Sequence, residues 1–276
     1  MSASFPIAGV IGFPVAHSLS PLLHGGWLAD LGIKGAYVPL EVAPSDLPAA
    51  IGGLKALGFA GANVTIPHKE SVLQLVDSID SVAQAIGAVN TLINRGGVIE
   101  GRNTDAHGFL ANLDGKVPGW RSMLGNRTAL VLGAGGAAKA VLYALRAAGI
   151  SRIAIANRHA ARAKLIAHDC QFIEWGDRNR AVPSAGLIVN TTSLGMRGQP
   201  VLELDLSRAP QDAVVYDLVY NPLRTELLRG AAARSLRTVD GLGMLIHQAR
   251  AGFSAWFGVE PPIDEAIYSR LAAALT

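Results

Sequence analysis

The chain has 276 residues, of which 50% are apolar and 16% charged, and its formal net charge is +3. This length exceeds that of a typical single hydrophobic core, so we expect two domains. The composition excludes a disordered protein. The basic residues are scattered, with no run of five like charges, so we expect no nucleic-acid-binding surface.

The one cysteine, Cys170, excludes an internal disulfide and is compatible with a reducing compartment. No Cys/His spacing typical of a metal site surrounds it, so we expect no metal and interpret the thiol as a small buried side chain. The N-terminal segment lacks the features of a signal peptide, and no stretch approaches 18 unbroken apolar residues. We therefore expect a cytoplasmic protein that does not span a membrane.

The first part of the chain alternates strands with helices. Apolar runs predict strands at residues 7–12, 35–42 and 61–67, and two more within 88–105. A helix is predicted from Ser20, with Pro21 in its first turn, and the apolar spacing predicts helices at 44–58 and 71–87. This order favours a mixed or parallel sheet.

A segment rich in Gly and Pro, residues 112–126, is interpreted as a linker to a second alternating unit. Apolar runs there predict strands at 128–133, 152–157, 185–193 and 212–220. Helices are predicted at 136–149, 158–170, 238–258 and 263–275. The fold class that we expect is α/β.

Residues 130–141, LVLGAGGAAKAV, place Gly133, Gly135 and Ala138 in a G-x-G-x-x-A pattern between a strand and a helix. Gly133 would permit the tight turn, Gly135 would let a pyrophosphate approach the backbone, and Ala138 would let the helix pack on the sheet. The alternative is a merely tight strand-to-helix turn. The strand–turn–helix context favours dinucleotide binding.

The next strand ends in Asn157 and Arg158, with Arg162 one helical turn further on. NAD-binding units usually carry a carboxylate here for the ribose 2′-hydroxyl, and this chain has none. Two guanidinium groups suit a 2′-phosphate, so NADP is the preferred cofactor. The alternative is a solvated helix start with ordinary arginines.

Polar residues gather in the loops after the first-domain strands, where open α/β sheets bind ligands. They suit a small polyhydroxy acid, although turn and cap chemistry would also explain them. They are Ser18, Ser20, Asn63, Thr65, Lys69, Asn90, Thr91, Asn103, Thr104 and Asp105.

Lys69 is notable because only 6 of the 24 basic residues are lysine. Removal of a hydride from an alcohol carbon requires the hydroxyl proton to leave as well, and a lysine amine can exchange that proton where arginine cannot. A nearby carboxylate such as Asp105 would hold the amine and hydrogen-bond the same hydroxyl.

Nine stretches in family order resemble the shikimate dehydrogenases. They are GFPVAHSLSPLLH (12–24), GANVTIPHK (61–69), GAVNT (87–91), GRNTDAHGF (101–109), GAGGAA (133–138), NRHAAR (157–162), NTTSLGM (190–196), DLVYNPLRTELL (217–228) and GLGMLIHQA (241–249). The resemblance implies reversible NADPH-dependent reduction of 3-dehydroshikimate to shikimate, a step in aromatic amino-acid biosynthesis.

The resemblance also implies residue roles. Lys69 and Asp105 would be the catalytic pair, and Ser18 and Ser20 would bind the substrate carboxylate. Ring hydroxyls would be bound by Asn63, Thr65, Asn90 and Gln248, with Tyr220 reaching the substrate from the cofactor side. NADP would be bound by Gly133, Ala134, Gly135, Gly136, Ala137, Ala138, Asn157, Arg158, Arg162, Thr191, Thr192, Ser193, Leu218, Gly241 and Met244.

The implied fold is an α/β substrate-binding domain, residues 1–110 and 245–276, with a Rossmann-like, doubly wound NADP-binding domain, residues 111–244, inserted in it. We expect a small-molecule substrate and a monomer or homodimer. Quinate/shikimate and aminoshikimate dehydrogenases with relaxed substrate or cofactor choice stay open as alternatives. A non-catalytic NADP-binding sensor would have no need of Lys69 and Asp105.

Some residues depart from the family pattern or resist interpretation. Gly25 and Gly26 stand inside a predicted helix, which they would loosen or kink. His159 stands where threonine is usual and is interpreted as a solvent-facing residue, with a phosphate contact as the alternative. For His68, beside the lysine, a packing role is preferred over a proton relay.

Overall fold

The computed structural model describes residues 5–275, and the chain divides into two compact units. The first takes the chain up to Asp105 and Leu245–Leu271, and the second takes Ala106–Met244 and the chain from Ala272 on. All three passages along the chain fall inside helices, namely α4 (Asp105–Lys116), α10 (Gly241–Phe257) and α11 (Glu265–Ala273). The domain boundaries given above, after residues 110 and 244, stay predictions.

The first unit is built on a mixed six-stranded sheet with the order β2-β1-β3-β5-β6-β4. Strands β1, β2 and β3 are parallel, β5 is antiparallel to both β3 and β6, and β4 is parallel to β6. The strands are β1 (Ile7–Gly12), β2 (Ala36–Glu41), β3 (Gly61–Val64), β4 (Ser78–Ile79), β5 (Thr91–Arg95) and β6 (Val98–Arg102).

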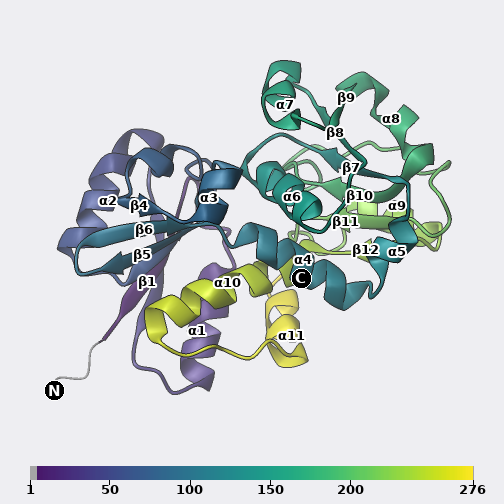
Figure 1. The fold of residues 1–276 in the computed structure, drawn as a ribbon. Coiled ribbons are helices and arrows are strands. Elements are labelled where there is room, and N and C mark those ends of the chain that lie inside the picture. Colours follow the sequence, from purple (N-terminus) through teal and green to yellow (C-terminus); the bar gives the residue numbers. More distant parts are fainter. Residues whose placement is uncertain (1–4, 276) are drawn as a thin grey trace. The chain divides into compact units, whose positions relative to one another are not determined.

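Helices α1 (Ser20–Asp30), α2 (Leu47–Ala56), α3 (Ser81–Ile86) and α11 (Glu265–Ala273) accompany this sheet, together with most of α10. Helix α10, yellow-green in Figure 1, packs on α1, where the rings of Trp27 and Phe253 meet edge to face at 5.4 Å. Gly25 and Gly26 do not interrupt α1, so the expected loosening is not seen as a break in the helix.

The single helix expected at 71–87 is wrong. The structure has a short 3-10 turn at Ser71–Gln74, then β4, and then α3. Asp77 accepts a hydrogen bond from the backbone N–H of Ile99, and Asp80 accepts one from Ala83 at the start of α3. These side-chain bonds and the pairing of β4 with β6 outweigh the helical spacing of the apolar residues.

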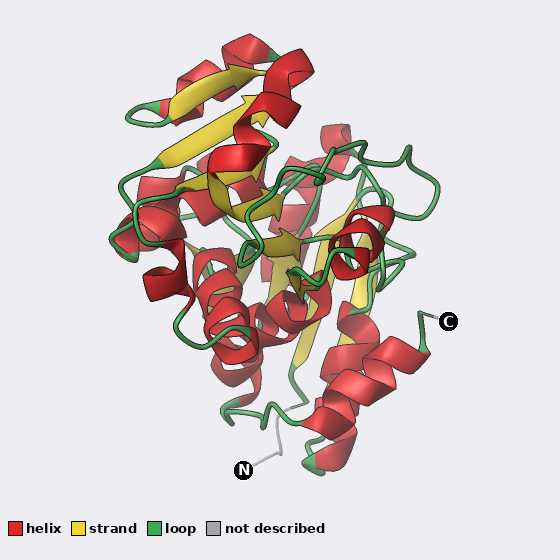
Figure 2. Cartoon of the chain, turned by 90° about the vertical axis from the view of Figure 1, so that its right-hand side faces the viewer, coloured by secondary structure: helices red, strands yellow, loops and turns green. Residues whose placement is uncertain are grey.

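The second unit contains a six-stranded, all-parallel sheet with the order β12-β11-β10-β7-β8-β9. The strands are β7 (Thr128–Leu132), β8 (Ile153–Asn157), β9 (Gln171–Glu174), β10 (Ala185–Asn190), β11 (Val214–Asp217) and β12 (Arg237–Val239). Helices α6 (Gly136–Ala147), α7 (Ala160–Ala167), α8 (Arg178–Ala181) and α9 (Glu226–Ala233) belong to the same unit. Figure 2 shows helices on both faces of the strands. The α/β class and the doubly wound second sheet are confirmed.

The linker expected at 112–126 is also wrong, because most of this segment is helical. Helix α4 runs to Lys116, and α5 (Trp120–Leu124) follows almost at once. The indole of Trp120 is buried and donates to Asp114 Oδ1 at 2.7 Å. Of the three glycines in this segment, Gly119 lies in the turn between the helices with a φ of 76°, Gly115 lies inside α4 and Gly125 follows α5.

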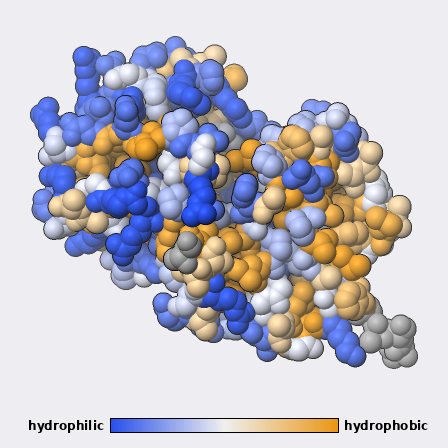
Figure 3. All heavy atoms as spheres, turned by 180° about the vertical axis from the view of Figure 1, so that it is seen from behind, coloured by the Kyte–Doolittle hydropathy of each residue, from blue (hydrophilic) through white to orange (hydrophobic). Residues whose placement is uncertain are grey.

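Hydrophilic and hydrophobic residues are interspersed over the face drawn in Figure 3. The most exposed large apolar side chains, Leu57, Ile66 and Leu165, come from separate elements. Within residues 5–275, no helix combines the length and the apolar character needed to cross a bilayer.

Candidate active site

Lys69 and Asp105 form an ion pair in the first unit. Lys69 lies in the turn after β3, and Asp105 is the residue at which α4 begins. Lys69 Nζ is 2.5 Å from Asp105 Oδ2, and the two side chains are 18% and 4% exposed. A carboxylate this deeply buried needs such a partner, because its charge has lost most of its water. Lys69 keeps part of its side chain exposed.

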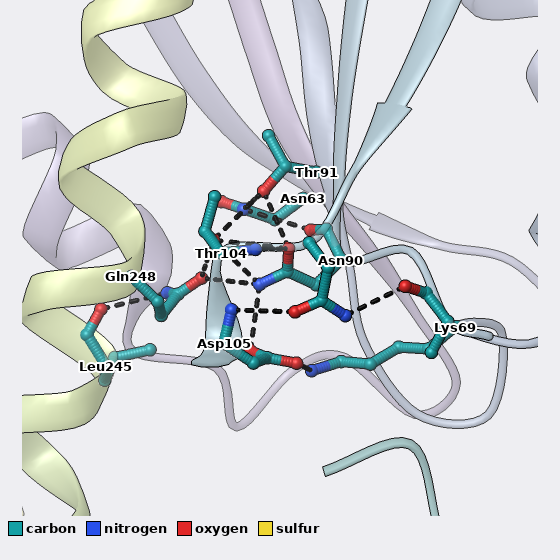
Figure 4. Close-up of polar contacts among 10 residues, drawn as sticks. Asn63, Lys69, Asn90, Thr91, Thr104, Asp105, Leu245 and Gln248 are labelled. Atoms are coloured by element: carbon teal, nitrogen blue, oxygen red, sulfur yellow. Dashed lines mark hydrogen bonds and ion pairs between the residues drawn. The ribbon is translucent and has the colours of Figure 1, made fainter. Parts of the chain in front are cut away.

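Asn90 connects this pair to its surroundings (Figure 4). Its Nδ2 lies 2.8 Å from Asp105 Oδ1, 2.9 Å from Thr104 Oγ1 and 3.1 Å from Gln248 Oε1. Its Oδ1 accepts the backbone N–H of Thr104 at 2.8 Å and the hydroxyl of Thr91 at 3.0 Å. Each oxygen of Asp105 is thereby fixed by a different partner, Lys69 on one side and Asn90 on the other.

Gln248 reaches this cluster from α10, far along the chain. Its Nε2 donates to the carbonyl of Leu245 at 2.9 Å, which orients Oε1 toward Asn90 (Figure 4). Lys69, Asp105, Asn90 and Gln248 were expected to belong to one site, and the structure brings them together. Their roles toward a substrate stay predictions.

Asn63 is joined to the same cluster through both atoms of its amide. Oδ1 accepts from the hydroxyl of Tyr37 at 2.7 Å, and Nδ2 donates to the carbonyl of Asn90 at 3.2 Å and to Thr91 Oγ1 at 3.3 Å. The residue is 5% exposed. In this arrangement Asn63 bonds to both Asn90 and Thr91.

Tyr37 is a site residue that the sequence analysis missed. Burial raises its pKa, and a hydrogen bond with the Ser20 side chain opposes the rise. Ser20 is buried near Tyr37, while Ser18 is half-buried and its Oγ accepts the backbone N–H of Ser20 at 3.2 Å. The alternation of β2 gave no signal for this role, because it places Tyr37 on the same face as Pro39 and Glu41, which are exposed.

Two further residues named in the sequence analysis, Thr65 and His68, follow the carboxyl end of β3. Thr65 is half-buried directly after β3, and its N–H donates to Ile11 at the end of β1. His68 is buried, and its Nε2 is 2.7 Å from the carbonyl of Val42. His68 therefore bonds to the neighbouring backbone, as its preferred packing role requires.

The loop between β7 and α6 has the geometry expected of a dinucleotide-binding turn. Gly133 adopts a φ of 117°, and a Cβ there would overlap Thr191 Oγ1. A Cβ on Gly135 would meet nothing within 4 Å, so the space at the start of α6 is open, while Ala138 is fully buried. The first N–H groups of a helix lack intrahelical partners, so this opening fits a phosphate.

Arg158 follows β8, the strand that pairs with β7, and Arg162 lies in the first turn of α7. Both side chains are exposed. Asn157 is used differently, because its Nδ2 donates to the carbonyl of His159 at 3.0 Å and so shapes the turn into α7. His159 is exposed, as its preferred interpretation requires. The arginines can supply charged donors to a phosphate.

The loops after β10 and β11 carry the other predicted cofactor residues. Thr191 donates from its hydroxyl to the carbonyl of Leu132 at 2.7 Å, beside the Gly133 turn. A Cβ on Gly241 would overlap the carbonyl of Leu218, so glycine lets the start of α10 approach this loop. Tyr220 is half-buried in the same loop, and Met244 is 8% exposed on α10.

Among the described residues there is no cluster of three or more His, Cys, Asp or Glu side chains that could hold a metal ion. The Lys69 cluster itself presents an amine, a carboxylate, amides and hydroxyls.

Family models match three parts of the chain. The model for the shikimate dehydrogenase substrate binding domain matches residues 10–92, that for shikimate / quinate 5-dehydrogenase matches 120–195, and that for the shikimate 5′-dehydrogenase C-terminal domain matches 241–267. The shikimate dehydrogenase (NADP(+)) of Paramagnetospirillum magneticum is 52% identical over 270 residues, covering 96% of this chain and 97% of the relative.

Solved structures agree with these matches. The shikimate 5-dehydrogenase of Thermus thermophilus in complex with NADP(H) and shikimate superposes with a TM-score of 0.86 at 36% identity, covering 99% of this chain and 100% of that one. The quinate dehydrogenase of Corynebacterium glutamicum in complex with NAD has a TM-score of 0.88 at 29% identity, covering 98% and 99%.

Proposed function

Because this chain belongs to the shikimate dehydrogenase family, we propose that it catalyses the reversible NADPH-dependent reduction of 3-dehydroshikimate to shikimate in aromatic amino-acid biosynthesis. The observation that carries this proposal is the Lys69–Asp105 pair, held at 2.5 Å inside a buried network of amides and hydroxyls. The reaction needs a group that exchanges a proton with the substrate oxygen, and Lys69 is a suitable one.

NADPH, when bound, supplies the hydride. During reduction the Lys69 ammonium gives its proton to the ketone oxygen, so that the oxygen becomes a hydroxyl and the amine becomes neutral. In the reverse direction the neutral amine takes the hydroxyl proton. Asp105 keeps Nζ in place through Oδ2, and Asn90 keeps the carboxylate in place through Oδ1. Fixing both groups before the reaction removes the entropy cost of orienting them.

The remaining site residues bind and orient. Ser18 and Ser20 bind the substrate carboxylate, and Asn63, Thr65, Asn90 and Gln248 address the ring hydroxyls. Tyr220 contacts the substrate from the cofactor side. The Gly133–Ala138 loop binds the pyrophosphate, and Arg158 and Arg162 bind the 2′-phosphate. The protein acts in the cytoplasm, as a monomer or homodimer.

An assay at 340 nm with shikimate or quinate and NADP or NAD tests this function. We expect turnover with shikimate and NADP to exceed that of every other combination. The structural likeness to a quinate dehydrogenase that binds NAD makes quinate with NAD the second candidate. The absence of a carboxylate at the end of β8, where Asn157 and Arg158 stand, weighs against it. Comparable rates with quinate and NAD would overturn the first proposal in favour of the second.

A further inference from the structure

Three buried polar residues of the second unit form a connected set that the reaction described above does not use. Asn190 ends β10, Asp217 ends β11 and Thr225 precedes α9, and they are 0%, 0% and 1% exposed. Asp217 Oδ1 accepts from Asn190 Nδ2 at 2.8 Å, and Oδ2 accepts from Thr225 Oγ1 at 2.7 Å. These three residues are called the Asp217 network.

The Asp217 network fixes the loop after β10. Asn190 Oδ1 accepts the backbone N–H and the hydroxyl of Thr192, at 3.0 and 2.7 Å, and its Nδ2 donates to the carbonyl of Leu194 at 3.1 Å. Since Asp217 holds the Asn190 amide in one orientation, it also determines which of these bonds Asn190 can make. The segment that contains Thr191, Thr192 and Ser193 is therefore shaped through Asp217.

The loop after β11 is fixed by the same carboxylate. Asp217 Oδ1 also accepts the backbone N–H of Val219 at 3.0 Å, and Leu218 donates its N–H to the carbonyl of Asn190. Thr225, at the far end of this loop, accepts from Leu228 and so caps α9. The loop that contains Leu218 and Tyr220 is thus held at both ends.

Stability alone does not explain a buried carboxylate, because well-packed apolar residues in its place usually stabilise a fold as much or more. A fully bonded polar network does select one geometry. Asn190 and Asp217 are partners in the register of β10 and β11, and both stand at the carboxyl ends of parallel strands, where open α/β sheets bind ligands.

We propose that Asp217 is a positioning residue that holds the loops after β10 and β11 in the shape that receives the nicotinamide half of NADP. This inference rests on the proposed function. The sheet order places β10 and β11 on one side of β7 and β8 on the other. A dinucleotide with its pyrophosphate at the Gly133–Ala138 loop and its ribose phosphate at Arg158 therefore directs its nicotinamide half toward β10 and β11.

The test compares two ligands by calorimetry in Asp217→Asn. NADP should bind about tenfold more weakly to this variant than to the wild type, a difference of roughly 1.4 kcal/mol. Adenosine 2′,5′-bisphosphate contacts only the adenosine side and should bind within about twofold of the wild type. Asp212→Asn is the matched control, since Asp212 is an exposed carboxylate of the same unit paired with Arg127, and it should bind both ligands normally.

Equal affinity for NADP in Asp217→Asn and the wild type would overturn the inference. So would an equal loss for both ligands, because that would indicate general damage to the unit. Thr225→Val removes the donor to Oδ2 and also the cap of α9, whereas Thr225→Ser keeps both. Weaker binding of NADP than of adenosine 2′,5′-bisphosphate in Thr225→Val, restored in Thr225→Ser, decides the matter if Asp217→Asn fails to fold. A wild type that binds neither NADP nor shikimate would instead refute the proposed function.

Discussion

The ring of His24 lies flat on the ring of Tyr37, with centroids 3.9 Å apart and planes 2° from parallel. His24 is fully buried among Trp27, Phe253 and Trp256, and neither of its ring nitrogens has a hydrogen-bond partner among the described residues. Since the Tyr37 hydroxyl donates to Asn63, this aromatic packing supports the candidate site.

Protonation of His24 should destabilise the fold. Burial lowers the pKa of His24 from 6.5 to about 3, and the nearby Asn63 amide opposes that fall without reaching hydrogen-bond geometry. Below pH 6.5, His24 is therefore protonated in the unfolded chain, whereas in the folded chain it stays neutral down to about pH 3. This contribution to stability is complete above pH 6.5 and is lost as the pH falls, by about 1.4 kcal/mol per pH unit.

Urea unfolding between pH 7 and pH 4 measures this effect. His24→Phe keeps a ring and removes the titrating group. It should reduce the slope of the unfolding free energy against pH by about 1.4 kcal/mol per pH unit, the contribution of one proton. His107→Asn, at an exposed histidine, is the control and should keep the wild-type slope. An unchanged slope in His24→Phe would contradict the assignment.

The two glycines of α1 should differ in their response to alanine. A Cβ on Gly25 meets nothing within 4 Å, so Gly25→Ala should stabilise the protein by about 1 kcal/mol through helix propensity. A Cβ on Gly26 would overlap Arg270 Nη1, which is paired with Asp30 at 2.9 Å. Gly26→Ala must displace that guanidinium, so it should stabilise the protein less than Gly25→Ala does.

A double-mutant cycle separates the two effects. In an Arg270→Ala background, Gly26→Ala should stabilise about as much as Gly25→Ala, since nothing then opposes the new methyl group. The free energy of unfolding in urea is the measurement. If Gly26→Ala were as favourable in the wild type as in that background, Arg270 would not be the obstacle.

Arg158→Ala should change the choice of cofactor. Loss of a charged donor to the 2′-phosphate should raise the KM for NADPH by about tenfold or more and leave the KM for NADH nearly unchanged. Arg152→Ala, at an exposed arginine just before β8, is the control. Equal increases of the KM for NADPH and for NADH would show that Arg158 does not bind the 2′-phosphate.

Much of the site could be predicted from sequence because its key residues stand in short motifs next to strand ends. Lys69 follows a recognisable apolar strand. Gly133 stands in a glycine pattern in which each position has a known structural role in binding a dinucleotide. Tyr37 and Asp217 could not be found this way. The bond of Tyr37 to Asn63 depends on β1 lying between β2 and β3, and the role of Asp217 depends on the register of β10 against β11.

The errors in the fold have a related cause. Helical apolar spacing at 71–87 was outweighed by carboxylates that bond to backbone N–H groups and by a two-residue strand that pairs with β6. At 112–126, Gly115 lies inside α4, Gly119 lies in the turn between α4 and α5, and Gly125 follows α5, an arrangement that composition alone could not distinguish from a linker. In both places tertiary or side-chain contacts decided the outcome.

The most direct test is the turnover of Lys69→Ala with shikimate and NADP, with shikimate affinity measured by calorimetry on the same sample. Loss of the proton-exchanging amine should lower kcat by about 100-fold to 10,000-fold. Shikimate affinity should change only a few-fold, because Ser18, Ser20 and Gln248 are intact. A kcat within a factor of about three of the wild type would show that the substrate proton is handled elsewhere.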